Sequence, residues 1–319
     1  MINGHSRKCK RLLSGLAVTV LLNACATAPQ SAALWQQTPQ SLLAPVLLSQ
    51  VPFFAQDLYQ CGPAALAIML GASGVTVTPE QLVPMVYVPE REGSFQIEMM
   101  AATRRHGRLA YEITPTLEAL LSEVAAGHPV LVLQNLGMDW YPQWHFAVVK
   151  GFDLAERQLT LNSGMTENYV MSLSTFERTW ARAEYWAILA LEPGVMPAVA
   201  EPIPYFSALA ALEQNNPLEL IGPGYVSGLQ QWPTDRNLLM GYGNLLYSDN
   251  DLAAAAEQFG KVIEHHPDYA PAHNNLANIL YELGQRDQAL VHAQQAVRLG
   301  GDYIESYRAT LRMIDPTAI

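Results

Sequence analysis

Apolar residues recur with two different periods along the chain, and the change between them predicts two kinds of domain. In residues 49–192, short β-branched runs alternate with segments of helical period. The runs predict strands at 109–113, 130–134, 145–152, 158–162, 168–172 and 185–191. Helices are predicted at 61–70, 95–106, 117–126 and 175–183, with Ser94 and Ser174 as caps, and Thr78-Pro79-Glu80-Gln81 is a capping box. We therefore predict an α+β domain over residues 49–192.

Residues 205–315 show helical periodicity that repeats every 34 residues. Corresponding positions are Pro233 and Pro267, Leu212, Leu246 and Leu280, Tyr225 and Phe259, Tyr247 and Tyr281, and Ala255 and Ala289. This pattern resembles tetratricopeptide repeats, which implies an all-α solenoid of about three units with a degenerate first unit and a face for a peptide or protein partner. Asn250 and Gly284 fall in turns where a left-handed residue is tolerated. The four prolines of residues 193–204 predict a semi-rigid linker before the repeats.

The first 24 residues have the pattern of a targeting segment. Basic residues at 7–11 precede an apolar run from Leu12 to Leu22, which is too short to span a bilayer. The run ends in Leu22-Asn23-Ala24-Cys25, which resembles the lipobox of bacterial lipoproteins. The resemblance implies a signal peptide over 1–24, lipid on Cys25, and an outer-membrane lipoprotein facing the periplasm; a plain secretory signal is the alternative. Residues 25–48, rich in Ser, Ala, Gln and Pro, are predicted to be a tether.

Charge excludes some classes of partner. The chain has 18 Lys and Arg against 29 Asp and Glu, a formal net charge of −11. Such an acidic chain lacks the clustered cations that nucleic acid or an anionic lipid surface requires, so membrane contact is expected through the lipid anchor alone. His265, His266, His273 and His292 have no Cys or carboxylate at metal-ligand spacing, and we expect neither a metal nor a cofactor.

Cys61 is the candidate nucleophile. The chain has three cysteines, of which Cys9 would leave with the signal and Cys25 would carry lipid. Cys61 begins the predicted helix 61–70, where unpaired N–H groups and the helix dipole favour a thiolate. Gln56 could offer its amide N–H to an oxyanion beside that helix. The alternative is that Cys61 is a buried small apolar residue and Gln56 a surface one.

His145 is the candidate base for this thiol. It opens the predicted strand 145–152 and follows an aromatic loop, Trp140-Tyr-Pro-Gln-Trp144, whereas His106 and His128 have the contexts of structural residues. The next strand runs back towards His145 if the hairpin contains a bulge or stagger. It ends in Asn162 and Ser163, of which Asn162 is the better candidate to fix the imidazole tautomer.

These pieces together resemble a known family. Gln56, then Cys61-Gly-Pro-Ala-Ala-Leu66, then His145-Phe-Ala-Val-Val-Lys-Gly-Phe-Asp153 are similar to the bacteriocin-processing (double-glycine leader) cysteine peptidases, a papain-like family. The resemblance covers about residues 51–190 and implies Cys61 as nucleophile, His145 as base, Gln56 as oxyanion donor and Asn162 as orienting residue. The family usually has Asp-Pro where this chain has Asn162-Ser163. Many members are fused to a membrane transporter with ATP-binding motifs, and no P-loop is found here.

Three functions are compatible with the sequence. The first is an envelope-anchored cysteine peptidase that acts through a thioester, with helical repeats that recruit substrate or partner. The second is a non-catalytic adaptor in which both domains only bind. The third is another amidase or transpeptidase reaction on the papain-like fold, distinguished by whether the acyl acceptor is water or an amine.

Overall fold

The computed structural model describes residues 28–55, 61–214 and 216–317. They divide into two compact units, the first with residues up to Met99 together with Glu112–Leu189, the second with Met100–Tyr111 together with Ala190–Ile319. Within the described residues, no helix is both long and apolar enough to cross a bilayer.

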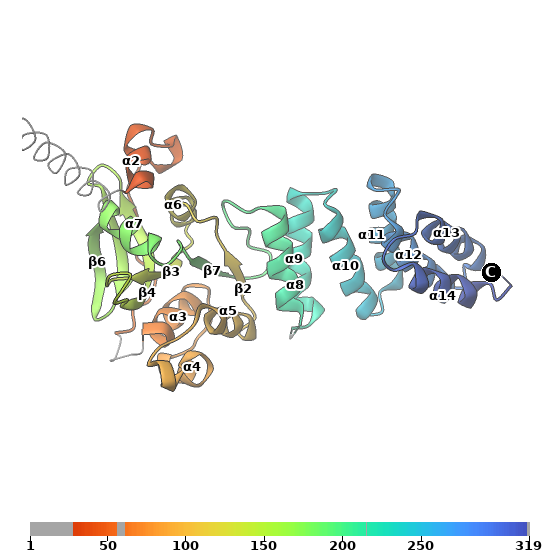
Figure 1. Cartoon of the computed structure of the whole chain (residues 1–319), viewed down its shortest axis with the longest axis horizontal. Helices are drawn as coiled ribbons and strands as arrows, with labels where there is room; N and C mark the ends of the chain where they lie inside the picture. Colours follow the sequence, from red (N-terminus) through yellow and green to blue (C-terminus); the bar gives the residue numbers. More distant parts are fainter. Residues whose placement is uncertain (1–27, 56–60, 215, 318–319) are drawn as a thin grey trace, which may run out of the picture. The chain divides into compact units, whose positions relative to one another are not determined.

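A single sheet organises the first unit (Figure 1). Within the described residues it has seven strands in the order β2-β7-β3-β4-β5-β6, with β1 paired to β4. The strands are β1 Val46–Leu47, β2 Leu109–Glu112, β3 Val130–Asn135, β4 Trp144–Asp153, β5 Gln158–Ser163, β6 Thr166–Ser172 and β7 Ala187–Leu191. The pairs that involve β3, β4 and β5 are antiparallel, which confirms the predicted α+β class.

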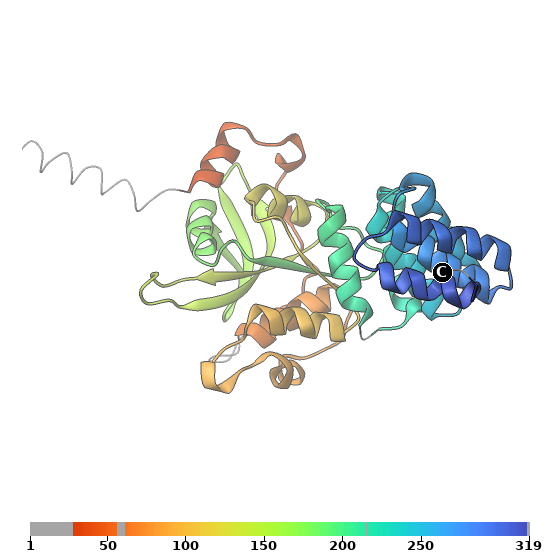
Figure 2. The ribbon, with the colours of Figure 1, turned by 45° about the vertical axis from the view of Figure 1, so that its right-hand side comes forward.

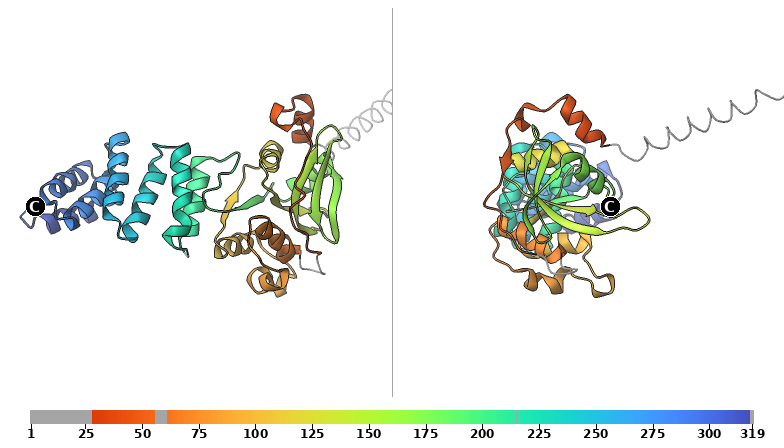
Figure 3. Two further views of the ribbon diagram at one scale, coloured as in Figure 1. Left: turned by 180° about the vertical axis from the view of Figure 1, so that it is seen from behind. Right: turned by 90° about the vertical axis from the view of Figure 1, so that its left-hand side faces the viewer.

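Helices cover both sides of this sheet. They are α2 Pro29–Gln36, α3 Cys61–Ala72, α4 Pro79–Val86, α5 Gln96–Arg105, α6 Leu117–Ala125 and α7 Leu173–Ala181, with 3-10 turns η1 Gln40–Leu42 and η2 Pro89–Arg91. In all views α3 and α4 lie on one side of the strands and α2 and α6 on the other (Figures 1, 2 and 3). Helix α3 is buried continuously from Gly62 to Leu70, because its sequence is apolar on every face.

The β4–β5 hairpin contains the irregularity that its unequal arms predict. The register shifts between Val149 and Gly151, where an extra residue of β4 is accommodated. Gly151 also permits strand β1 to approach closely, since a Cβ there would lie 2.6 Å from the Val46 carbonyl oxygen. The bulge changes which β5 side chains face His145, and this matters for the site.

Part of the predicted tether is a docked helix. The backbone N–H groups of Gln30 and Ser31, at the start of α2, donate to the two oxygens of Glu177 at 2.9 and 2.7 Å. Glu177 is buried on α7, and Ser31 is buried too. A buried carboxylate that receives the free N–H groups of a helix start stabilises that helix end. Residues 29–36 are therefore folded onto the first unit instead of forming a tether.

Two predicted caps also differ from the structure. Helix α7 begins at Leu173, and Ser172, not Ser174, accepts the Thr175 N–H as its cap. Ser94 does not cap α5, because its buried Oγ has no hydrogen-bond partner among the described residues. The capping box of α4 is formed as predicted, with Thr78 and Gln81 in reciprocal contact.

The second unit is a row of helices in antiparallel pairs (Figure 3). They are α8 Pro202–Glu213, α9 Leu218–Gln231, α10 Arg236–Ser248, α11 Leu252–His265, α12 Ala270–Glu282, α13 Arg286–Leu299 and α14 Ile304–Ile314. Residues at the 34-residue spacing occupy one core that includes Leu246, Leu280, Ala255, Ala289 and Phe259. The turns contain Asn250 and Gly284 at φ 64° and 75°, so the predicted left-handed positions are confirmed.

Candidate functional site

Cys61 is the first residue of α3 and lies at a cavity of about 580 Å³. Its free thiol is partly exposed, so the residue is not a closed core position. The other walls of the cavity are residues 91–96, Trp144 and Phe146 of β4, and residues 182–184 after α7. A volume of this size falls within the range of small-molecule and peptide-side-chain sites.

The sulfur of Cys61 is surrounded by backbone N–H groups. Hydrogen bonds from the peptide groups of Phe146, Gly62 and Cys61 itself favour the thiolate and lower its pKa. Burial acts more strongly in the opposite direction, and the pKa of the thiol is raised above its ordinary value of 9.0. The sequence-based expectation of a thiolate at the helix start is therefore wrong for the free protein, because desolvation outweighs the helix terminus.

His145 lies on β4 between Trp144 and Phe146, the two residues of that strand that line the Cys61 cavity, and its own side chain points to the opposite face of the strand. The Phe146 N–H that faces the thiol belongs to the peptide group that joins His145 to Phe146. His145 Nε2 shares a hydrogen bond of 2.8 Å with Ser163 Oγ. Burial lowers the pKa of the imidazole below its ordinary 6.5, so the ring is neutral at pH 7. With the proton on Nε2, Nδ1 is the nitrogen able to accept another.

Asn162 does not contact the imidazole. It pairs with Val148 across the hairpin, its Nδ2 donates to the Pro52 carbonyl at 2.9 Å, and its Oδ1 accepts the Asn168 N–H at 3.3 Å. The carboxamide thus fastens the segment before α3 to strand β5. The structure gives Ser163, the weaker sequence candidate, the position beside His145, because the bulge in β4 changes the register expected for an uninterrupted hairpin.

Of the remaining sequence candidates, the structure places the two other histidines but neither Gln56 nor Cys25. Gln56 and Cys25 lie outside the described residues. His106 Nδ1 bonds the Ala102 carbonyl oxygen at 2.8 Å, and His128 Nδ1 bonds the Glu123 carboxylate at 2.8 Å. Both histidines are therefore structural, as predicted.

Sequence reasoning missed Ser94 as part of the site. Ser94 lines the cavity with Cys61, and its side chain packs so tightly on Gly62 that a Cβ at residue 62 would lie 2.6 Å from the Ser94 Cβ. The pair fixes the first turn of α3, on which the thiol is carried. A glycine directly after the candidate nucleophile was the only sequence signal for this contact.

Acyl transfer from a neutral pair requires the His145 imidazole to reach the Cys61 thiol. A neutral imidazole can remove the thiol proton as the sulfur attacks a carbonyl carbon, and N–H groups at the start of α3 can stabilise the resulting oxyanion. Thiolate formation is then coupled to attack, instead of preceding it in the free protein.

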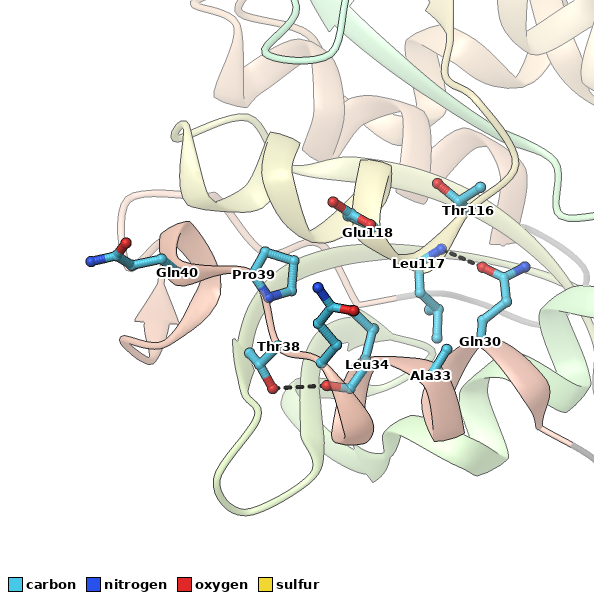
Figure 4. A pocket seen from close by; sticks show the side chains of 10 residues that line it. Gln30, Ala33, Leu34, Thr38, Pro39, Gln40, Thr116, Leu117 and Glu118 are labelled. Carbon is cyan, nitrogen blue, oxygen red and sulfur yellow. Dashed lines mark hydrogen bonds between the residues drawn. The ribbon is translucent and has the colours of Figure 1, made fainter.

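A second cavity of about 690 Å³ lies between α2 and α6 (Figure 4). Gln30 Oε1 accepts the Leu117 N–H at 2.6 Å at one end, and Thr38 donates to the Leu34 carbonyl at the other. Its lining consists of amide, hydroxyl and aliphatic side chains with one carboxylate, Glu118. It contains no pairing of a nucleophile with a base.

Histidines of the second unit form a pair but no metal cluster. His273 and His292 share a hydrogen bond of 3.0 Å between their Nδ1 atoms, and His273 Nε2 bonds the Pro267 carbonyl oxygen at 3.0 Å. Among the described residues, no group of three His, Cys, Asp or Glu side chains is placed to hold a metal ion.

Comparison with known proteins separates the two parts of the chain. Residues 48–188 match the Peptidase_C39 like family, and residues 246–314 match the tetratricopeptide repeat. No curated protein matches. Among solved structures, a double glycine motif protease from an AMS/PCAT transporter, in complex with the leader peptide, is 21% identical with a TM-score of 0.34, over 46% of this chain and 96% of that one. YrrB, a TPR protein with an unusual peptide-binding site, is 21% identical with a TM-score of 0.32, over 35% of this chain and 58% of that one.

Proposed function

Because the chain contains a Peptidase_C39-like domain followed by tetratricopeptide repeats, we propose that it is a cysteine peptidase of the cell envelope. The observation that carries the proposal is the partly exposed Cys61 thiol at a cavity, beside the peptide group that joins His145 to Phe146. In this proposal the repeats bind the substrate or a protein partner. Lipid on Cys25 holds the protein at the outer membrane on its periplasmic side.

The reaction proceeds through a thioester. His145 takes the thiol proton as Sγ bonds to the scissile carbonyl carbon, and N–H groups at the start of α3 and the Gln56 amide stabilise the oxyanion. The tetrahedral intermediate expels the amine, which receives that proton from the imidazolium. Water, deprotonated by His145, then hydrolyses the thioester and releases the acid. Ser163, and not Asn162, orients the imidazole in this scheme.

Helices α10 and α12 of the repeats carry polar side chains that could bind a partner. Asn275 Nδ2 donates to Asn244 Oδ1 at 3.1 Å between α12 and α10, and the Tyr247 hydroxyl donates to Glu282 at 2.6 Å. Tyr247 and Tyr281, one repeat apart, are 43% and 36% exposed. Amide and phenol groups of this kind can bind a peptide backbone and its side chains together.

A peptide-library experiment tests the catalytic proposal. The full chain and its Cys61→Ala variant are incubated with a proteome-derived peptide library, and mass spectrometry identifies new peptide ends. We expect new peptide ends with the full chain and none with the Cys61→Ala variant. A peptide vinyl sulfone, which alkylates reactive thiols, should label Cys61 and no other residue. Cys61→Ser is the matched control for fold, because it preserves the shape of the side chain. Identical peptide patterns from all three proteins would refute the peptidase.

One observation favours the adaptor as a second candidate. Asn162, which the family resemblance assigns to orient the base, instead bonds the Pro52 carbonyl and the Asn168 N–H, so the expected catalytic triad is not assembled. An adaptor would retain its full cellular activity as the Cys61→Ala variant, whereas the peptidase would lose it. A transpeptidase would be recognised by peptide ends joined to an amine instead of to water.

A further inference from the structure

The connection between β3 and β4 exposes a cluster of large apolar side chains. In this segment, the 136–144 hairpin, the exposed fractions are 80% for Trp140, 64% for Tyr141, 58% for Met138 and 55% for Trp144. The hairpin can be followed in Figure 2 as the loop that projects from the strands. Single exposed apolar residues are ordinary, but an adjacent group of aromatics marks an interaction site.

Hydrogen bonds hold this hairpin in one conformation. Asn135 Oδ1 accepts the backbone N–H groups of Gly137 and Gln143, both at 2.9 Å. The Arg182 guanidinium donates to the Gly137 carbonyl from the far end of α7. At the tip, Met138 and Tyr141 exchange backbone hydrogen bonds of 3.1 and 3.0 Å. The aromatic rings are therefore displayed on a fixed backbone, which lowers the entropy lost when a ligand binds.

The hairpin continues into the Cys61 cavity. Trp144 and Arg182, which belong to or support the hairpin, both line that cavity. Trp140 lies in the turn that Met138 and Tyr141 close, four residues before Trp144 in the sequence. A peptide that is bound at Cys61 and passes Trp144 would continue onto the exposed side chains of the hairpin.

We propose that the 136–144 hairpin is a docking surface for an apolar segment of the peptide substrate that lies outside the Cys61 cavity. The proposal rests on the peptidase function proposed above and adds a recognition surface outside the reacting groups. Aromatic anchors on a rigid loop are the side chains that contribute most to binding peptides. The segment 136–144 contains Asp139 and no Lys or Arg, whereas a loop that contacts anionic lipid combines aromatics with cations.

Selection of peptides against an inactive chain tests this surface independently of catalysis. The full chain with Cys61→Ala is used to select from a phage-displayed library of random 12-residue peptides. Selected peptides are then synthesised and titrated against this chain and against the same chain with Trp140→Ser and Tyr141→Ser added. Both tip residues are largely exposed, so the added changes leave the fold intact. Tyr169→Ser, at an exposed tyrosine of β6, is the matched control.

We expect peptides with clustered apolar side chains whose Kd rises at least about tenfold in the double variant and stays unchanged in Tyr169→Ser. Equal affinity for the double variant overturns the proposal, as does selection of peptides that bind only the repeats. The chains are also sedimented with phosphatidylethanolamine–phosphatidylglycerol vesicles. If the double variant sediments less than its parent but binds the peptides with unchanged affinity, the hairpin is a membrane contact and the proposal is overturned. If the wild-type chain cleaves none of these peptides but the double variant no longer binds them, the docking surface stands and the peptidase proposal fails.

Discussion

The contact between Gly62 and Ser94 makes the start of α3 intolerant of even one methyl group. In a Gly62→Ala variant the new Cβ would lie 2.6 Å from the Ser94 Cβ and nearer still to its Oγ, where ordinary contacts are 3.4–4 Å. The first turn of α3 or the 91–96 segment must therefore move by about 0.8 Å or more. Overpacking of this kind costs about 1–3 kcal/mol, and the helix propensity gained by replacing Gly with Ala offsets at most about 1 kcal/mol.

A double-mutant cycle isolates this contact. We expect Gly62→Ala to reduce the free energy of unfolding by about 1–2 kcal/mol in the wild-type background, and to be neutral or stabilising when Ser94→Gly removes both contacting atoms. Ser94→Ala, which removes only Oγ, should relieve part of the loss. Urea unfolding followed by tryptophan fluorescence reports on the correct unit, since five of the six tryptophans belong to it.

The control is Gly260→Ala in α11, where nothing lies within 4 Å of the added methyl group and we expect stabilisation of about 0.5–1 kcal/mol. Because α11 belongs to the second unit, its unfolding is followed by circular dichroism of the helical signal. The alkylation rate of Cys61 by iodoacetamide should change with Gly62→Ala alone, because the thiol is carried on the displaced turn. Equal losses of stability from Gly62→Ala with and without Ser94 would refute the steric reasoning.

Four further outcomes follow from the site and the repeats. Ser163→Ala should lower kcat/KM on peptides by about tenfold or more with little loss of stability, since it removes the partner of His145 Nε2; an unchanged rate would exclude Ser163 as the orienting residue. The depressed pKa of His145 should give the pH profile of kcat/KM an acid limb below 6.5, and the raised pKa of Cys61 should keep iodoacetamide alkylation slow until the pH exceeds 9.0; fast alkylation at pH 7 would contradict the burial argument. The pKa of His292 is lowered by burial and then by His273, so unfolding binds protons and the helical unit should lose stability as the pH falls below 6.5. His292→Gln should weaken this acid dependence, as measured by the circular-dichroism melting temperature at pH 5 and 7.

Local patterns in the sequence were sufficient for the elements of the fold. The capping box at Thr78, the left-handed turns at Asn250 and Gly284, and the need for a bulge opposite the short arm of the β4–β5 hairpin are all present. These features depend on residues close in sequence, or on counting residues between two strands that must pair. Periodicity alone was therefore enough to predict the two fold classes.

Contacts between distant residues could not be predicted in the same way. No residue near position 30 indicates that Glu177, far away in the sequence, accepts the first N–H groups of α2. Without that contact, the Ser-, Ala-, Gln- and Pro-rich composition of residues 25–48 predicts an unfolded segment. The choice between Asn162 and Ser163 depends on a one-residue shift, which exchanges the faces of a strand. The ionisation of Cys61 depends on how much solvent the cavity removes, and a motif does not encode that quantity.

By holding α2, the carboxylate of Glu177 also limits how far the first unit can move from residue Cys25. With α2 fastened from Pro29 onwards, a chain attached at Cys25 has only about 14 Å of reach. If Cys25 carries lipid, the unit is confined within a helix diameter or so of the bilayer surface and cannot sweep through the surrounding space. Release of α2 from Glu177 would lengthen this connection by the eight residues of the helix.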